Sequence, residues 1–157
     1  MYKNLQHFID TLEQAGELVR ISTFVDPVLE IAEITDRMSK VDGPALLFEN
    51  TGTDFPLLIN SMGSEKRICL ALGVKHLDDI KNEIEALFKD LAGPKNSLLD
   101  KLMLLPKLGK VGSWMPKLRS GRGECQEIIY QGEAANLEML PILKCWVHDG
   151  GRFITLP

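Results

Sequence analysis

Residues 43–50 read Gly43-Pro44-Ala45-Leu46-Leu47-Phe48-Glu49-Asn50, a short apolar run between residues that favour turns. Four consecutive apolar residues, without the alternation of a half-exposed strand, are typical of a strand covered on both faces. Residues 50–54 predict a turn with Gly52 at its centre, and Leu57-Leu58-Ile59 is a second short apolar run. We therefore expect the two runs to form a hairpin or neighbouring strands of one sheet.

On the N-terminal side, helical and strand patterns alternate. Residues 4–16 carry apolar side chains at helical spacing, with a suitable N-cap at the start and a glycine at the end. The stretch 18–25 is rich in β-branched residues and predicts a strand. Asp26 is a capping residue placed before Pro27, whose fixed φ suits the first position of a helix. A second helix is therefore expected from Pro27 to about Lys40.

The C-terminal side adds three helical patterns before its character changes. Residues 64–73 begin with a capping serine and end with a glycine, and residues 77–91 give the clearest helical stripe of the sequence. Residues 98–105 predict a further short helix. Beyond a stretch rich in glycine and lysine, residues 126–130 and 152–156 predict strands.

These elements predict the α/β fold class and a division of the chain into parts. We expect an N-terminal mixed α/β domain over residues 1–106, a basic Gly-rich connector over residues 107–124, and the start of a second domain over residues 125–157. Two strands in that last part have too few partners to bury both faces. Because complete proteins protect such apolar edges, we expect the chain to be a truncated piece of a longer protein.

The composition of the 157 residues is that of a globular chain, with 45% hydrophobic and 25% charged residues and a net charge of −4. These values exclude fibrous, collagen-like and strongly disordered proteins. Cys69, Cys125 and Cys145 are too widely spaced for a disulfide framework or a Cys-x-x-Cys pair, and Cys69 is expected in the core. Without a signal peptide or a membrane-spanning apolar run, we expect a reduced, cytoplasmic protein.

A local basic stretch covers residues 101–123, which hold six basic side chains and no acidic one. Such a stretch favours an anionic partner, nucleic acid included, through counterion release. Its glycines interrupt any regular element, and Trp114 is its only aromatic residue for stacking bases, so a solvated connector is the simpler interpretation. The basic residues are Lys101, Lys107, Lys110, Lys117, Arg119 and Arg122.

Two groups near the C-terminus are candidates for chemistry. A carboxylate such as Asp149 raises the basicity of a neighbouring imidazole, here that of His148. Adjacent residues on an extended segment point to opposite faces, however, which argues against a direct pair. A surface histidine is the plainer interpretation. Gly150-Gly151 admits a ligand at close range, and a turn there would present Arg152 to an anion; a plain tight turn explains the same residues.

Acidic residues on the second predicted helix are a further candidate. Glu30, Glu33 and Asp36 have a spacing that brings carboxylates together on one helix face. The plainer interpretation is that they are solvated or paired with Arg37 or Lys40. The sequence has no Gly-x-Gly-x-x-Gly motif, no Walker loop and no Ser-centred nucleophile elbow.

A series of short segments, taken in order along the whole chain, forms a distinctive pattern. The first segments are Gly16–Ile21, Val25–Ile31, Asp36-Arg37, Gly43–Asn50, Asn60, Gly63, Arg67 and Leu72-Gly73. The later ones are Cys125-Gln126, Leu140-Pro141-Ile142, Cys145-Trp146 and Phe153-Ile154-Thr155. Together these segments resemble the UbiD family of decarboxylases. Each segment is short, but their order and spacing make the resemblance specific, and residues 95–120 are the least diagnostic.

The resemblance implies an N-terminal α/β domain, then a split β-barrel related to flavin reductases, then a C-terminal domain important in oligomerisation. This chain would hold only the first strands of the barrel. Complete relatives are carboxy-lyases of aromatic or α,β-unsaturated carboxylic acids, among them an acid of ubiquinone biosynthesis. Their prenylated FMN, divalent metal, potassium and Glu-Arg-Glu catalytic group are held by segments beyond the position that matches Pro157.

The resemblance therefore implies no catalytic, cofactor-binding or metal-binding residue in this chain. We expect a scaffold or gating portion that is inactive by itself. Its expected partners are the remaining domains of the parent enzyme and further copies of it, with no nucleic acid and no integral membrane segment. Two other classes stay open: a stand-alone module that binds an anion or nucleic acid through the basic connector, and an oligomerisation domain.

Overall fold

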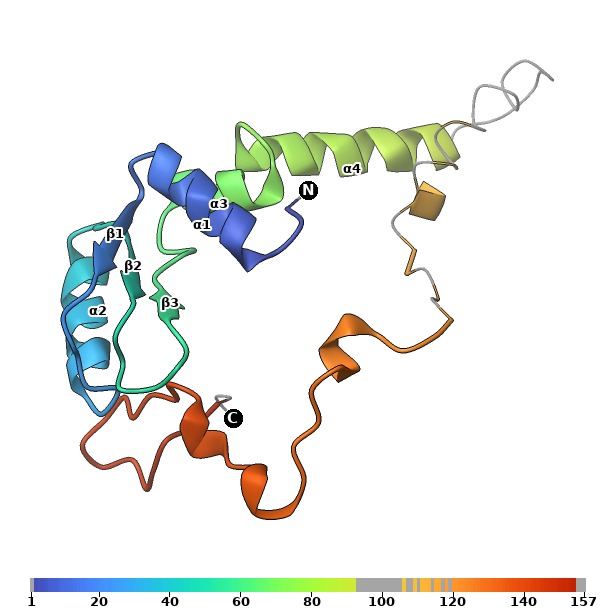
Figure 1. Ribbon diagram of the computed structural model, residues 1–157. Coiled ribbons are helices and arrows are strands. Elements are labelled where there is room, and N and C mark those ends of the chain that lie inside the picture. The colour runs from blue at the N-terminus through green and yellow to red at the C-terminus, as the bar shows by residue number, and fades with distance from the viewer. Residues whose placement is uncertain are drawn as a thin grey trace. The chain divides into compact units, whose positions relative to one another are not determined.

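The computed structural model describes residues 2–92 and 120–154, and between them residues 106, 109, 111–113, 115, 116 and 118. These residues form two compact units. One unit comprises the residues up to Lys75 together with those from Glu133 on, and the other runs from His76 to Gly132. Figure 1 shows the elements along the chain, with the sheet in the first unit and the longest helix in the second.

The first unit is built around a three-stranded sheet in the order β1-β2-β3. β1 (Leu18–Ile21) is parallel to β2 (Ala45–Phe48), and β2 is antiparallel to β3 (Leu57–Ile59). All residues of β2 are buried, which confirms the prediction of a strand covered on both faces beside a neighbouring strand. β1 is shorter than the strand predicted over 18–25, because its partner β2 ends at Phe48.

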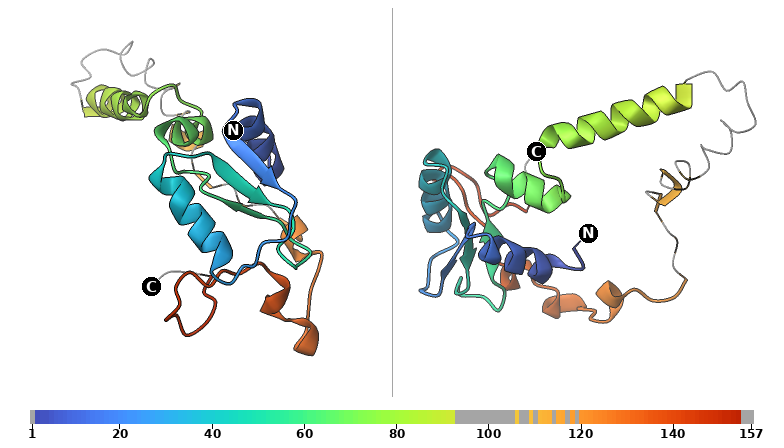
Figure 2. Two further views of the ribbon diagram at one scale, coloured as in Figure 1. Left: turned by 90° about the vertical axis from the view of Figure 1, so that its left-hand side faces the viewer. Right: turned by 90° about the horizontal axis from the view of Figure 1, so that it is seen from above.

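Helices cover both faces of this sheet, as Figure 2 shows. α2 (Glu30–Lys40) packs on one face, against a core cluster that contains Leu46. α1 (Leu5–Gln14) and α3 (Glu65–Leu72) lie on the other face, around a second cluster that contains Ala45. Successive residues of β2 thus serve opposite faces, as the pleat of a strand requires. The mixed α/β class is confirmed.

The ends of α1 and α3 follow from local chemistry. The side-chain oxygen of Asn4 accepts a hydrogen bond from the His7 N–H at 2.9 Å, and that of Ser64 accepts one from the Arg67 N–H at 3.3 Å. Both bonds satisfy a donor that the first turn of a helix leaves free. Gly73 ends α3 with a φ of 69°, a left-handed conformation that glycine adopts at low cost. These predicted boundaries are confirmed.

α2 begins at Glu30, and the prediction of a start at Pro27 is wrong. The Asp26 carboxylate accepts a hydrogen bond from the Val28 N–H at 2.7 Å, so it closes a turn and does not cap the helix. Leu29 then has a φ of 72°. A helix cannot continue through a left-handed residue, and α2 therefore starts after it.

The second unit contains α4 (Leu77–Ala92), in agreement with the helical stripe over 77–91. Its apolar side chains remain partly open to solvent: Ile84 is 44% exposed and Phe88 65%. Within the described part of the chain, no helix combines the length and apolar character that crossing a membrane requires. The helix predicted over 98–105 lies outside the described residues.

The prediction of strands over 126–130 and 152–156 is wrong wherever the structure describes those residues. Residues 127–130 and 152–154 are irregular, and 155–157 lie outside the described part. A strand needs a partner for its backbone groups, and no described segment pairs with these two. The C-terminal part instead forms three short 3₁₀-helices: η1 (Glu124–Gln126), η2 (Gly132–Ala134) and η3 (Leu137–Met139).

Candidate functional site

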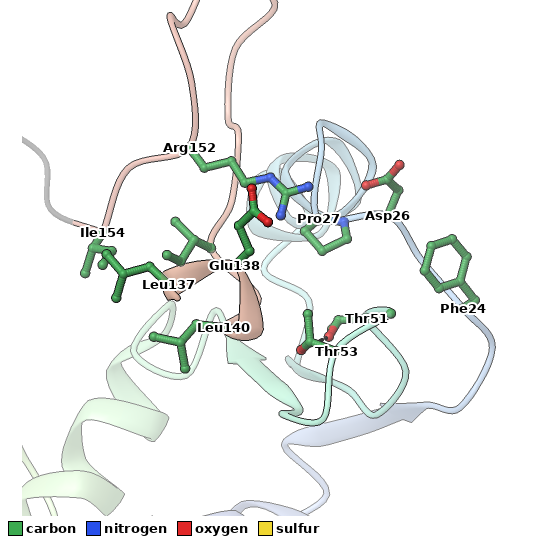
Figure 3. A pocket seen from close by; sticks show the side chains of 12 residues that line it. Phe24, Asp26, Pro27, Thr51, Thr53, Leu137, Glu138, Leu140, Arg152 and Ile154 are labelled. Atoms are coloured by element: carbon green, nitrogen blue, oxygen red, sulfur yellow. Dashed lines mark hydrogen bonds between the residues drawn. The ribbon is translucent and has the colours of Figure 1, made fainter. Parts of the chain in front are cut away.

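A pocket of about 790 Å³ lies at the carboxyl ends of β1 and β2 (Figure 3), and we call it the loop pocket. It is formed by residues 22–29 after β1, residues 49–56 after β2, and residues 137–154, the C-terminal segment. Ligands of α/β proteins bind at such strand ends, where the loops diverge. The lining residues are Phe24, Asp26, Pro27, Thr51, Gly52, Thr53, Leu137, Glu138, Leu140, Ile142, Arg152 and Ile154.

Backbone hydrogen bonds fix the C-terminal segment to the loop after β1. Val28 and Lys144 form an isolated parallel bridge. The Leu29 N–H donates to the Lys144 carbonyl at 3.0 Å, and the Lys144 N–H donates to the Pro27 carbonyl at 3.2 Å. This bridge holds the backbone ahead of α2 in a non-helical conformation, which explains the late start of that helix.

The turn after β2 shapes the opposite wall of the loop pocket. Thr51 is only 2% exposed, and its hydroxyl donates to the Phe55 carbonyl at 3.0 Å. Gly52 has a φ of 76°, and a Cβ there would lie 3.0 Å from Cε2 of Phe24. A glycine at this position therefore lets the Phe24 ring lie against the turn, while 53% of that residue remains exposed. The predicted turn around Gly52 is confirmed.

Three charged side chains line the loop pocket. One carboxylate oxygen of Asp26 is engaged by the Val28 N–H, and Glu138 lies in η3, whose N-cap Asn136 accepts from the Glu138 N–H at 2.9 Å. In Figure 3 the side chains of Glu138 and Arg152 extend into the same space. No salt bridge joins Arg152 to any residue that the structure describes. Among the described residues, the exposed Arg152 guanidinium therefore has no ion-pair partner.

A second concave surface, which we call the apolar groove, has a volume of about 540 Å³. Trp146 is 75% exposed and Phe153 56%, although both are large apolar side chains. Exposed apolar surface of this kind marks a place where another molecule or segment packs. The lining residues are Leu57, Leu140, Pro141, Ile142, Leu143, Cys145, Trp146, Asp149, Phe153 and Ile154.

An ion-pair cluster joins the start of β1 to α3. Arg67 is 1% exposed, and its Nη1 lies 2.9 Å from Oε2 of Glu17, whose other oxygen lies 2.8 Å from Nζ of Lys66. The hydrogen bond from Lys66 lowers the pKa of the Glu17 carboxyl, and that from Arg67 acts in the same direction, against the desolvation that raises it. The buried Nε and Nη2 of Arg67 have no hydrogen-bond partner among the described residues.

This cluster predicts a loss of stability in acid. A carboxyl whose pKa is lower in the folded than in the unfolded chain stabilises the fold above its unfolded value, near 4.5 for Glu17. That contribution disappears as the pH falls through the folded pKa. We expect the urea midpoint of Glu17→Gln to vary less with pH below about 4.5 than that of the parent chain. Equal slopes for the two proteins would contradict this assignment.

The structure does not bring His148 and Asp149 together as a catalytic pair. Oδ2 of Asp149 accepts a hydrogen bond from the Trp146 N–H at 3.0 Å, and the Asp149 N–H donates to the Trp146 carbonyl at 3.1 Å. Asp149 therefore closes a tight turn, and His148 is an exposed residue of that turn. Arg152, a few residues on, is the member of this stretch that reaches the loop pocket.

The acidic residues of α2 are paired on its exposed side, as the plainer interpretation predicts. Oε1 of Glu33 lies 2.7 Å from Nη2 of Arg37, and Asp36 pairs with Lys40. The hydrogen bond to Asp36 raises the pKa of Lys40. Glu30 accepts a backbone hydrogen bond from the turn that precedes the helix. These carboxylates do not converge on a ligand site.

The remaining candidates are cysteines and basic residues. Cys69 is buried, as predicted, whereas Cys145 is exposed and lines the apolar groove. The side chain of Cys125 lies outside what the structure describes. In the described part of the chain, no three His, Cys, Asp or Glu residues are placed to hold a metal ion. Of the basic residues between 101 and 123, only Arg122 falls within the described residues.

Two parts of the sequence match families of known proteins. Residues 9–87 match the N-terminal domain of 3-octaprenyl-4-hydroxybenzoate carboxy-lyase, and this match alone covers half of the chain. The chain belongs to the UbiD family. Residues 117–157 match the Rift-related domain of the same UbiD carboxy-lyase, so both matches follow the order of one family.

Related proteins cover the chain from end to end. An uncharacterized protein of Aquifex aeolicus is 48% identical over an alignment that covers 98% of this chain and 32% of that protein. One of Archaeoglobus fulgidus is 41% identical over 99% of this chain and 31% of its own length. The chain therefore spans about a third of the length of the curated relatives it matches.

Solved UbiD-class structures also resemble the fold. Vanillic acid decarboxylase of Sedimentibacter hydroxybenzoicus, in its closed form, has a TM-score of 0.50 and 28% identity, covering 61% of this chain and 21% of that one. The enzyme HmfF of Pelotomaculum thermopropionicum, in complex with FMN, has a TM-score of 0.46 and 27% identity, covering 54% and 19%.

Sequence analysis of this UbiD family member does not find the loop pocket. Phe24 and Glu138 give no signal, because one is an isolated aromatic residue in a loop and the other a single acid in an irregular region. Two signals do exist. Gly52 marks the turn that forms one wall, and the turn residues before Arg152 predict a tight turn next to the arginine that lines the pocket.

Proposed function

We propose that this chain is the N-terminal scaffold of a UbiD-type carboxy-lyase that acts on aromatic or α,β-unsaturated carboxylic acids. The observation that carries the proposal is the pair of ordered family matches, one to an N-terminal domain and one to a Rift-related domain. In this proposal residues 1–106 are the N-terminal α/β domain and residues 107–124 the connector. Residues 125–157 begin the split barrel of a longer, oligomeric protein.

The reaction class explains why a scaffold alone would be inactive. Decarboxylation leaves an electron pair on carbon, and prenylated FMN, with a divalent metal and potassium, would supply a place for that pair in the parent enzyme. The loop pocket does not fit a flavin phosphate, because the negative charges of Asp26 and Glu138 would repel a phosphate dianion bound beside Arg152. We therefore propose that segments outside this chain hold the cofactor.

The apolar groove is the part of the chain that we assign to the scaffold role. Trp146 and Phe153 expose apolar surface, and they belong to the segment that matches the Rift-related domain. We propose that the rest of the barrel packs on this groove. Movement of the barrel on the groove would then open and close a cleft between domains, which is the gating role.

The test compares the 157-residue chain with a protein extended to the length of its relatives. We expect no flavin absorbance and no carbon dioxide release from the short chain when both are produced with prenylated FMN. We expect both properties in the longer protein. Flavin bound to the short chain in stoichiometric amount would overturn the proposed division of roles.

The alternative of an anion-binding connector is tested separately. Binding of a nucleic acid through Lys107 to Arg122 would weaken steeply as salt rises, because each neutralised phosphate releases counterions. Affinity that does not change with salt would exclude this alternative. An oligomerisation domain is tested by light scattering over a range of concentrations.

A further inference from the structure

One residue ahead of α2 is held in a conformation that its type disfavours. Leu29 has a φ of 72°, in the left-handed region, where the Cβ of a side chain crowds the following carbonyl oxygen. Leucine lacks both the freedom of glycine and the short polar side chain that allows asparagine to adopt this region. A strained residue persists only where its surroundings determine its conformation, so contacts outside Leu29 must hold it there.

The C-terminal segment supplies those contacts. The Leu29 N–H donates to the Lys144 carbonyl at 3.0 Å, and the Lys144 N–H donates to the Pro27 carbonyl at 3.2 Å. Leu143, the neighbour of Lys144, packs against the core cluster that α2 covers. Both segments belong to the first compact unit. The left-handed conformation of Leu29 therefore depends on residues that are far away in the sequence.

The local sequence favours a different conformation of the same residues. Asp26 and Pro27 suit the N-cap and the first position of a helix, and leucine is a good helix former. The hydrogen bond from the Val28 N–H to the Asp26 carboxylate is the bond that an N-cap makes to the second helical residue, so it would persist in a helix that began at Pro27. In that helix the Pro27 carbonyl would accept from the next turn and would no longer be free for Lys144.

We propose that the C-terminal segment and the start of α2 form a two-state switch. In the docked state, which the structure shows, the bridge to Lys144 holds Leu29 left-handed and α2 begins at Glu30. In the released state the C-terminal segment leaves, Leu29 becomes right-handed, and α2 begins at Pro27 with Asp26 as its N-cap. The strain at Leu29 favours release, and the bridge favours docking.

The switch determines whether the loop pocket exists. Asp26 and Pro27 line the pocket from the loop after β1, and Leu140 and Ile142 line it from the C-terminal segment. Release would separate these two walls and place Asp26 and Pro27 at the start of a longer α2. Leu143 lines the apolar groove and also packs on the core cluster. A partner that packs on the groove would therefore shift the balance between the two states.

The switch is a property of the backbone of this chain and requires neither a cofactor nor turnover. Its failure would leave the proposed carboxy-lyase assignment intact. A longer protein without decarboxylase activity would overturn that assignment and leave the switch intact.

A matched pair of substitutions at Leu29 tests the strain, with amide hydrogen exchange of the 157-residue chain as the measurement. Leu29→Gly and Leu29→Ala both remove the side chain, but only glycine adopts a left-handed φ readily, and alanine favours a helix. We expect the Lys144 N–H to exchange about tenfold more slowly in Leu29→Gly than in Leu29→Ala. The Glu49 N–H, which donates to the Ile21 carbonyl in the sheet, is the reference and should exchange at similar rates in both variants.

A second pair of substitutions, at Lys144, tests the released state. Lys144→Pro removes the N–H that donates to Pro27, whereas Lys144→Ala retains it. We expect Lys144→Pro to move the NMR Cα shifts of Val28 and Leu29 toward helical values, and Lys144→Ala to leave them as in the parent chain. Adding Asp26→Ala to Lys144→Pro should reduce the helical shifts, because the longer helix loses its N-cap.

Three outcomes would overturn the switch. The first is equal exchange of the Lys144 N–H in the two Leu29 variants. The second is a slowing at Glu49 as large as that at Lys144, which would place the effect in the stability of the whole unit. The third is a folded Lys144→Pro chain in which Val28 stays non-helical. Should Lys144→Pro fail to fold, the Leu29 pair decides, because Leu29→Ala should also show the more helical Val28 Cα shift of the two.

Discussion

Phe48→Ala is expected to lower the free energy of unfolding by about 3–5 kcal/mol. Phe48 is fully buried in β2 and belongs to the core cluster with Val25, Ile31 and Leu46, on the face that α2 covers. Removing the ring loses the free energy gained by burying it away from water. It also leaves a cavity, because the strand is packed on both faces and cannot move to fill the space. Urea unfolding followed by circular dichroism measures the effect.

Phe88→Ala provides the matched control for this prediction. The same atoms are removed, but Phe88 lies on α4 and is 65% exposed, so its loss should cost less than about 1 kcal/mol. Equal losses for the two variants would mean that Phe48 is not part of a packed core. A loss at Phe88 alone would place the stability of the chain in its second unit.

Arg67→Met is expected to lower the free energy of unfolding by about 3 kcal/mol. The guanidinium is buried beside Glu17, and removing one member of a buried pair leaves the other charge uncompensated. The loss should fall at the low end of the range for buried pairs, because Lys66 still reaches Glu17 and because two Arg67 nitrogens have no partner among the described residues. Methionine retains much of the side-chain volume.

Lys66→Met is the control for the buried pair. Lys66 forms an ion pair with the same Glu17 carboxylate but is 60% exposed, so its removal should cost less than about 1 kcal/mol. The double-mutant cycle of the two variants isolates their coupling through the shared carboxylate. A loss for Arg67→Met no larger than that for Lys66→Met would contradict the structural role of the buried arginine.

Local chemistry made much of the first unit predictable. β2 is recognisable because four consecutive apolar residues require cover on both faces, and α3 because Ser64 and Gly73 supply its two caps. In each case the residues that determine the element lie within it or next to it. The helix over 77–91 is recognisable for the same reason, since its apolar stripe is a property of the helix itself.

The start of α2 and the loop pocket could not be predicted in this way. The residues before α2 fit a helix beginning at Pro27, but the turn closed by Asp26 and the bridge to the distant Lys144 hold them in another conformation. The loop pocket likewise combines Phe24 with Arg152, which no local pattern relates. The prediction of a strand over 126–130 is wrong for the opposite reason. Its local pattern suits a strand, but no described segment pairs with it.

The bridge between Val28 and Lys144 has a consequence for synthesis on the ribosome. The three strands and α2 emerge from the ribosome long before Lys144 does. The backbone groups of Pro27 and Leu29 that bond to Lys144 therefore have no partner during that time. Pairing of residues so distant along the polypeptide is slow, and the loop it closes is long. Until that segment is synthesised, the loop after β1 lacks the backbone hydrogen bonds that hold it in the folded chain, and we expect it to be a site of chaperone binding.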